Sequence, residues 1–313
     1  MARYSPDCSS TPLGGAWEAA TQLDSFGVLY YPNMQEISIA KWSDFDQLME
    51  HGGRFTSWAF RGQRDADWQM WTSLSRHLRD FGVQPDFWPA QEARIIRIFK
   101  RKAHLHLTHV PDNTDTFQWL ALIQHYGGPT RLLDFTWSPY VAAFFALETA
   151  TSDAAVYALD TRAVSAQPTS ASAGENPNLR TAGTFESLFL PGEAEFVGHA
   201  EPGVLNPRLI AQLGTFIVPS ILDQSAESVI ERACGPDALV KLRLMHSLRD
   251  EAMRSLYGRN VHNTSLFPDL NGLAASLRYE LETHWAFDVK TGAEYPGWGL
   301  QPYAKSTDTS IVE

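Results

Sequence analysis

The sequence predicts a single α+β domain with a mixed, largely antiparallel sheet and surrounding helices. The chain of 313 residues is long enough to bury a substantial core without disulfides. Helical and strand-like patterns follow one another without regular alternation, and no segment repeats. We therefore expect one domain over residues 21–284, with loosely held tails at 1–20 and 285–313.

Hydrophobic periodicity and capping residues define the elements of the first half. Ser43 caps a helix, and the strand beginning at Trp58 ends at Gly62. Apolar residues at helical spacing, with basic residues on the other faces, indicate a long amphipathic helix after Pro89. The expected elements are a strand at 27–31, a helix after Trp42, a strand at 58–62, and helices at 72–78, 89–109 and 115–125.

The second half begins with a helix that is apolar almost all round. Ser138 is its N-cap and Pro139 its first residue. Gly258 ends a later long helix. The expected order is this buried helix, a strand at 154–159, a surface loop at 163–183, an ordered segment at 194–197, a helix at 207–211, a strand at 214–218, and helices at 237–257 and 270–283.

Composition narrows the functional classes. A formal net charge of −11 and a pI near 5.4 argue against non-specific binding to a nucleic-acid backbone, although a local basic groove is compatible with them. Two cysteines are too few for a disulfide framework, and the chain shows neither a signal peptide nor an apolar run of about 18 residues. We expect a cytoplasmic, soluble protein.

The most informative segment is residues 124–136. It combines seven hydrogen-bonding or ionisable side chains with the turn formed by Gly127, Gly128 and Pro129. Such a segment is costly to bury, and it leads directly to the N-terminus of the apolar helix. Free backbone N–H groups and the helix dipole favour an anion there.

Four ordered motifs over roughly residues 50–275 resemble the FRG domain family. The first contains Phe60, Arg61 and Gly62, followed by Gln63, Asp67, Trp68 and residues 73–76. The others are residues 124–136 with the alanine- and phenylalanine-rich helix behind them, residues 208–216, and residues 265–270. Where the family usually has Trp after the Asp of its turn, this chain has Phe135.

A second resemblance is to ADP-ribosyltransferases that cleave NAD. Their three-part pattern is similar to Arg61 at a strand end, Thr136 with Ser138 before an apolar helix, and Gln212 before a later strand. Glu195 is the second candidate for the last part. The resemblance implies an ADP-ribosyltransferase-like fold, with the sheet split around a cleft, and NAD as substrate.

This resemblance also implies roles for individual side chains. Arg61 would bind the diphosphate, and Gly62 would let the ligand come close. Thr136 or Ser138 would orient the ribose or Arg61. Apart from this resemblance, Trp137 lies inside the polar motif and is a candidate for stacking on a base. Gln212 can bind ribose hydroxyls, but an amide is no general base. The sites assigned to the ligand are Arg61, Gly62, Gln63, Arg131, Thr136, Trp137 and Ser138, and those assigned to catalysis are Gln212, Glu195 and His125.

The polar turn admits two interpretations. Arg131 could hold a second phosphate, His125 could donate to the ligand or shuttle a proton, and Asp134 could orient either one. Alternatively, Arg131 and Asp134 form a buried ion pair and His125 bonds to backbone. Glu92 resembles a family acid that could enter the pocket. Close histidines at positions 104, 106 and 109 do not share a helix face, so we expect no metal site.

The leading hypothesis is an NAD-cleaving enzyme that transfers or hydrolyses ADP-ribose, with a role as a bacterial toxin or anti-phage effector. The expected ligand is a nucleotide or dinucleotide, and the expected acceptor of ADP-ribose is an unidentified macromolecule. We expect no membrane partner, and a nucleic-acid partner is disfavoured but not excluded. The first rival is a nucleotide-sensing module without turnover. The second is a metal-independent nuclease or hydrolase that uses His125 and Asp134.

Overall fold

The computed structural model describes residues 22–23, 29–30, 34–51, 55–167, 177–190, 195–284 and 286–294. The expected tail at 1–20 lies outside these residues, as does most of the expected tail at 285–313. The strand expected at 27–31 is described as β2 (Leu29–Tyr30), which pairs antiparallel with β1 (Gln22–Leu23). In the described part of the chain, no helix is both long and apolar enough to cross a membrane.

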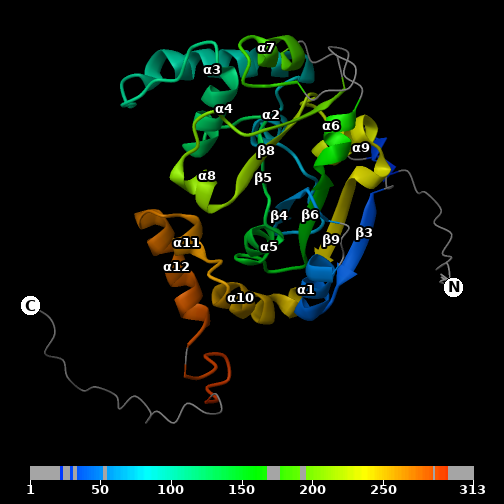
Figure 1. The fold of residues 1–313 in the computed structure, drawn as a ribbon, viewed down its shortest axis with the longest axis vertical. Coiled ribbons are helices and arrows are strands. Elements are labelled where there is room, and N and C mark those ends of the chain that lie inside the picture. Colours follow the sequence, from blue (N-terminus) through cyan, green and yellow to red (C-terminus); the bar gives the residue numbers. More distant parts are fainter. Residues whose placement is uncertain are drawn as a thin grey trace, which may run out of the picture.

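Seven strands form one open sheet, in which only the β3–β9 pair is parallel (Figure 1). The expected mixed, largely antiparallel sheet is therefore confirmed. In spatial order the strands are β3 (Gln35–Ile39), β9 (Leu239–Leu244), β6 (Ala154–Asp160), β4 (Trp58–Gln63), β5 (Leu133–Thr136), β8 (Gly214–Pro219) and β7 (Val197–Ala200).

Helices surround this sheet. Several begin at N-caps, because the side chains of Thr72, Asp115, Ser138 and Asn206 each accept a hydrogen bond from a backbone N–H of the first turn. The expected cap Ser138 is thus confirmed, whereas the expected cap Ser43 lies inside α1. The helices are α1 (Trp42–His51), α2 (Ser73–Asp80), α3 (Trp88–Ala103), α4 (Thr116–His125), α5 (Pro139–Leu147), α6 (Thr161–Ala166), α7 (Thr184–Phe189), α8 (Pro207–Ala211), α9 (Ala226–Cys234), α10 (Arg249–Gly258), α11 (Asn263–Leu266) and α12 (Leu270–Glu282).

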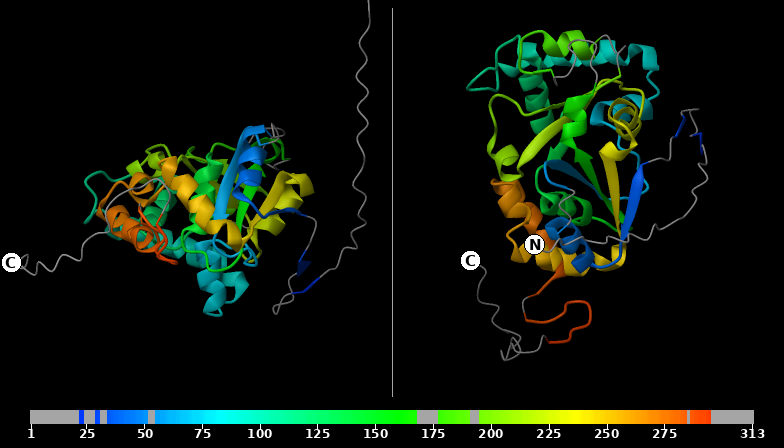
Figure 2. Two further views of the ribbon diagram at one scale, coloured as in Figure 1. Left: turned by 90° about the horizontal axis from the view of Figure 1, so that it is seen from below. Right: turned by 45° about the vertical axis from the view of Figure 1, so that its right-hand side comes forward.

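The expected helix at 237–257 is wrong in its first half. Residues 239–244 form β9, which lies between β3 and β6 and is visible beside the blue β3 in Figure 2. The segment alternates with period two: Val240 and Leu242 pack into a core cluster, whereas Lys241 lies on the opposite face and pairs with Glu36. Only α10 keeps the expected helical end at Gly258.

Two other boundaries differ from expectation. The amphipathic helix expected to reach residue 109 ends at Ala103, so the three histidines that follow lie beyond α3. The loop expected from residue 163 begins inside α6, and residues 168–176 lie outside the described residues. These segments have short or weak periodicity, and tertiary packing decides their boundaries.

Helix α5 packs directly on β4, and Gly62 makes this contact close. A Cβ atom built at Gly62 would lie 2.0 Å from the carbonyl oxygen of Ala142 and 2.6 Å from the backbone nitrogen of Ala146. Buried residues of α5 join α10 and α1 in a core on this side of the sheet, while α9 covers a second core. The absent side chain at position 62 thus serves helix packing, and Gly62 also lines two of the cavities beside Arg61.

Candidate functional site

The sheet is weakly paired at its centre, between β4 and β5. Strand β4 pairs with β6 at six positions and β5 pairs with β8 at four, but β4 and β5 share only the pair of Phe60 with Thr136. One residue further along β4, the Nη1 of Arg61 donates to the carbonyl oxygen of Asp134 at 2.8 Å. The side chain of Arg61 therefore occupies the place where the two strands part.

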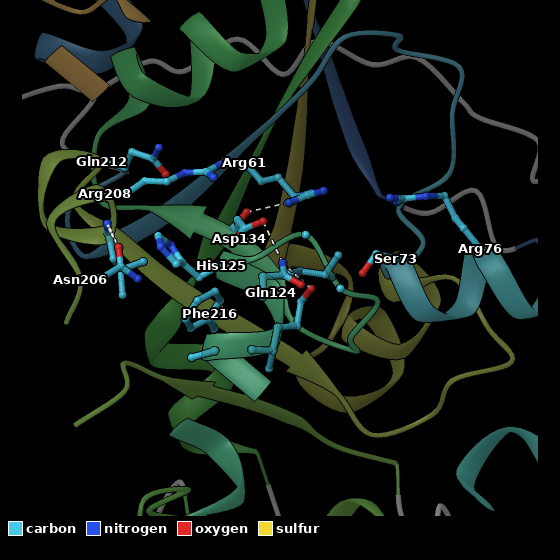
Figure 3. A pocket seen from close by; sticks show the side chains of 16 residues that line it. Arg61, Ser73, Arg76, Gln124, His125, Asp134, Asn206, Arg208, Gln212 and Phe216 are labelled. Atoms are coloured by element: carbon cyan, nitrogen blue, oxygen red, sulfur yellow. Dashed lines mark hydrogen bonds between the residues drawn. The ribbon is translucent and has the colours of Figure 1, made fainter. Parts of the chain in front are cut away.

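Arg61 lines three adjoining cavities. We call them the central cavity, about 210 Å³, the tryptophan groove, about 740 Å³, and the Thr136 cavity, about 210 Å³. The central cavity is lined by polar residues from α2, α4, β5 and α8: Ser73, Arg76, Gln124, His125, Asp134, Asn206, Arg208 and Gln212. Figure 3 shows Arg61 between Arg208 and Gln212 on one side and Arg76 on the other. The three hollows therefore form one site around a single guanidinium.

This site is locally basic in an acidic protein. In the central cavity the guanidinium groups of Arg61, Arg76 and Arg208 face one carboxylate, that of Asp134. Among the described residues, the side chain of Arg208 makes no hydrogen bond or ion pair, and its guanidinium lies over the ring of Phe267 at 4.5 Å. With the chain at −11 overall, such a concentration of cations favours an anionic ligand.

Arg61 has donors to spare. Its side chain is half-buried, and its Nε is buried with no hydrogen-bond acceptor among the described residues. Burial lowers the pKa of Arg61, and the nearby Asp134 carboxylate opposes this shift. A guanidinium stays charged in proteins, so the unused N–H is a binding group. A buried donor without a partner is rare, and a ligand oxygen would satisfy it.

A hydrogen-bond network fixes the wall opposite Arg61. The Thr130 hydroxyl donates to the Gln124 side-chain oxygen, and the Gln124 amide nitrogen donates to Oδ2 of Asp134 at 2.9 Å. Backbone N–H of Thr130 in turn donates to the Ser73 hydroxyl at 3.0 Å. The turn that the sequence predicts to be stiff is thus tied to α2, and it holds the Asp134 carboxylate at the cavity wall.

His125 is the last residue of α4 and lines the central cavity. Burial lowers its pKa, the neighbouring Arg208 lowers it further, and Asp269 opposes both. The imidazole is therefore neutral near pH 7 and can accept or donate a proton. The alternative interpretation was that the His125 ring bonds to a backbone group. No such hydrogen bond is present among the described residues.

Thr136 and Gln212 meet at the Thr136 cavity. The Thr136 hydroxyl donates to the carbonyl oxygen of Gln212 at 2.7 Å, and the Gln212 amide nitrogen donates to the carbonyl oxygen of Leu266 at 3.1 Å. Gln212 also lines the central cavity. Three expected site residues that are far apart in sequence, Arg61, Thr136 and Gln212, thus line one cavity.

Arg131 is not in this site, and its expected phosphate contact is wrong. Its side chain is fully buried and forms an ion pair with Glu92, whose side chain is also fully buried. The remaining donors reach carbonyl oxygens of Phe189, Pro219 and Ser220. The alternative pairing with Asp134 is also wrong, and Glu92 does not enter the pocket.

Three further residues lie outside the three cavities. Glu195 forms an ion pair with Arg232 on α9 at 2.9 Å. Ser138 caps α5, accepting from the backbone N–H of Val141. Trp137 donates from its indole N–H to Glu201 at 2.9 Å. Each of these polar groups already has a structural partner away from Arg61.

Gln63 lines the tryptophan groove but has a structural partner. Its amide nitrogen donates to the carbonyl oxygen of Trp68 at 2.6 Å, so it positions the following turn. Sequence reasoning missed Arg76 and Arg208 as site residues, although both belong to motifs that the resemblance covers. For Arg208 the signal was a cation with no acidic neighbour at helical spacing. Asp80 lies four residues after Arg76, so the spacing gave no such signal there.

No group of three or more His, Cys, Asp or Glu side chains in the described part of the chain could hold a metal ion.

The fold and site define an open-sheet α+β protein with an arginine-lined pocket where β4 and β5 part. A family model for the FRG domain matches residues 56–155. The match contains Arg61 and the turn at 124–136, whereas Arg208 and Gln212 lie beyond it. Comparisons with curated proteins and with solved structures found no significant match.

Proposed function

We propose that this protein binds a nicotinamide dinucleotide and breaks its nicotinamide–ribose bond, transferring ADP-ribose to an acceptor or to water. The observation that carries the proposal is the convergence of Arg61, Thr136 and Gln212 on one cavity, in the order of the three-part transferase pattern. The parting of β4 and β5 supports the expected cleft. We further propose that residues 21–284 act as one cytoplasmic domain.

The pocket chemistry suits this reaction. Arg61 and Arg208 are placed to bind the diphosphate with charge-assisted hydrogen bonds. Bond cleavage develops positive charge on the ribose, and Asp134 is the carboxylate that lines both the central and the Thr136 cavities. A preorganised carboxylate there would stabilise that charge. Gln212 would bind ribose hydroxyls, and neutral His125 would accept the acceptor's proton.

A second candidate is a sensor that binds the same ligand without turnover. It is favoured by the position of Gln212, which offers an amide where a transferase would place a general base, and by Glu195, which is held by Arg232. A hydrolase or nuclease that uses His125 and Asp134 is a third candidate, because both residues line the central cavity.

Mass spectrometry after incubation with NAD separates these candidates. An enzyme would release nicotinamide and form ADP-ribose or an ADP-ribosylated product. The rate of nicotinamide release should fall at least tenfold in Arg61→Ala, because one charge-assisted hydrogen bond contributes roughly 1.5–3 kcal/mol. Arg94→Ala is the matched control, because Arg94 is exposed on α3 outside the three cavities. Binding without consumption supports the sensor, and cut nucleic acid with intact NAD supports the nuclease.

The proposed role as a toxin or anti-phage effector follows only from consumption of NAD. Induced expression in bacteria would then lower cellular NAD and slow growth, and Arg61→Ala would restore both. Growth arrest that persists in Arg61→Ala would contradict this role.

A further inference from the structure

The tryptophan groove is not explained by the binding of one diphosphate. It is the largest of the three cavities around Arg61, and its wall adds Arg64, Arg76 and Arg79 to that guanidinium. The carboxylate in the lining, that of Asp67, is paired with Arg243 at 2.7 Å. The groove therefore presents a run of cations that continues outward from Arg61.

An exposed indole lies within this run. Trp68 is 48% exposed, which is unusual for a tryptophan, and the guanidinium of Arg64 lies over its ring at 4.8 Å. Arg79 lies over the ring of the buried Trp71 at the same distance. Two guanidinium groups of the groove thus lie over two indole rings.

The turn that carries Trp68 is held rigidly. The carbonyl oxygen of Trp68 accepts hydrogen bonds from the side chain of Gln63 at 2.6 Å and from the Tyr157 hydroxyl at 3.4 Å. The neighbouring Asp67 is anchored by Arg243, and backbone N–H of Ala66 donates to the carbonyl oxygen of Asp153. An exposed aromatic ring on a fixed backbone loses little entropy when a partner stacks on it.

We propose that the tryptophan groove binds a single strand of nucleic acid, with a base stacked on Trp68 and phosphates on Arg64, Arg76 and Arg79. Stacking on an indole and cation contacts along a backbone are how sequence-tolerant single-strand sites work. A duplex keeps its bases stacked on one another, whereas a single strand can offer one to Trp68. An acidic peptide would gain from the arginines and nothing from the ring.

The overall negative charge sets the conditions for this binding. Charges more than about 10 Å away are largely screened at 0.1 M salt, so the local arginines decide whether the strand binds. Neutralising three or four phosphates predicts a slope of log K against log salt of roughly −2 to −3. Binding is therefore weak at high salt.

A role for the bound nucleic-acid strand as acceptor of ADP-ribose rests on the proposed function, whereas the binding of the strand to the groove does not. As acceptor, a base nitrogen of the strand would attack ribose C1′. The C1′–nitrogen bond to nicotinamide breaks, nicotinamide leaves as a neutral base, and the attacking nitrogen releases its proton to His125 or solvent. The groove adjoins the central cavity through Arg61 and Arg76, so strand and dinucleotide would meet there.

The test is fluorescence anisotropy of the full chain with a labelled single-stranded oligonucleotide of mixed sequence, at two salt concentrations. We expect Trp68→Ala to weaken binding about tenfold and Arg64→Ala with Arg79→Ala to weaken it similarly while making the salt slope shallower. Trp137→Ala and Arg94→Ala are the matched controls, because an exposed indole and an exposed guanidinium there lie outside the groove.

Two outcomes overturn the inference: no binding by the unaltered protein at low salt, or equal loss in the control variants. Tighter binding of an acidic peptide than of the oligonucleotide, unaffected by Trp68→Ala, would assign the groove to a protein partner instead. Nicotinamide release without added strand reports on the proposed function separately. It would persist in Trp68→Ala even if the groove bound no nucleic acid.

Discussion

Arg61 and Arg131 lie in the two glycine-containing polar motifs of this chain, yet the structure uses them in opposite ways. Arg131 is fully buried and directs its donors to Glu92 and three carbonyl oxygens. Arg61 directs one donor to the carbonyl oxygen of Asp134, leaves its Nε without an acceptor, and lines three cavities. The unused donor makes Arg61 the better candidate for ligand binding.

The two environments also explain what each residue contributes. A buried ion pair recovers its desolvation cost only when its geometry is good and its other donors are satisfied, as around Arg131. This pair joins α3 to the start of β5 and to the end of β8. Removing Arg131 should therefore cost stability, whereas removing Arg61 should cost mainly ligand affinity.

The largest expected effect is that of Arg131→Met. It leaves the Glu92 carboxylate buried without a partner, and we expect the free energy of unfolding to fall by roughly 3–5 kcal/mol. Chemical denaturation monitored by circular dichroism measures it. The double variant Arg131→Met with Glu92→Leu should recover most of the loss. A single variant as stable as the unaltered chain would remove the distinction between the two arginines.

Gly62→Ala should come next. The added Cβ would meet backbone atoms of Ala142 and Ala146, which cannot rotate away, so α5 must shift from β4. Overpacking of this kind costs about 1–3 kcal/mol, measured by the same denaturation. Gly258→Ala is the control, because a Cβ there meets no atom within 4 Å. Equal effects in the two variants would contradict the close helix–strand contact.

Arg208→Ala tests the site without touching the core. Arg208 is exposed and makes no ion pair among the described residues, so stability should change by less than about 0.5 kcal/mol. Affinity for NAD should fall roughly tenfold. Equilibrium dialysis with labelled NAD measures this, and unchanged affinity would exclude Arg208 from the ligand contacts.

The smallest effect concerns His125. Burial and then Arg208 lower its pKa, with Asp269 opposing, so the unfolded chain binds this proton more readily than the folded one. The free energy of unfolding therefore falls as the pH drops below the usual histidine pKa of about 6.5. Arg208→Ala should raise the pKa of His125, as followed by NMR titration. A lower pKa in that variant would contradict the proximity of the two groups.

Much of the fold could be predicted from local patterns. The strand at Trp58, the helix after Ser138 and the helix after Asn206 all carry capping residues or clear periodicity. Strand β9 was missed although Lys241 and Arg243 alternate with apolar residues, a period-two pattern that indicates a strand, because the segment lies close before the helical pattern of α10. Pairing with β3 and β6, which are distant in sequence, makes this segment a strand.

The site could be predicted in part for a similar reason. The motifs indicated Arg61, Thr136 and Gln212, which share a cavity. Local sequence could not tell whether Arg131 points into a pocket or toward Glu92, because that acid is distant in the chain. It also could not reveal that Arg76 and Arg208 converge on Arg61, since three separate segments bring them together.

The most direct test of the central claim is titration calorimetry with NAD on the unaltered protein and on Arg61→Ala, both at 0.1 M salt. If the guanidinium of Arg61 binds the diphosphate, the unaltered protein gives a saturable heat of binding, and Arg61→Ala binds at least tenfold more weakly while remaining folded. No heat with the unaltered protein, or equal affinity in the two, would contradict the account.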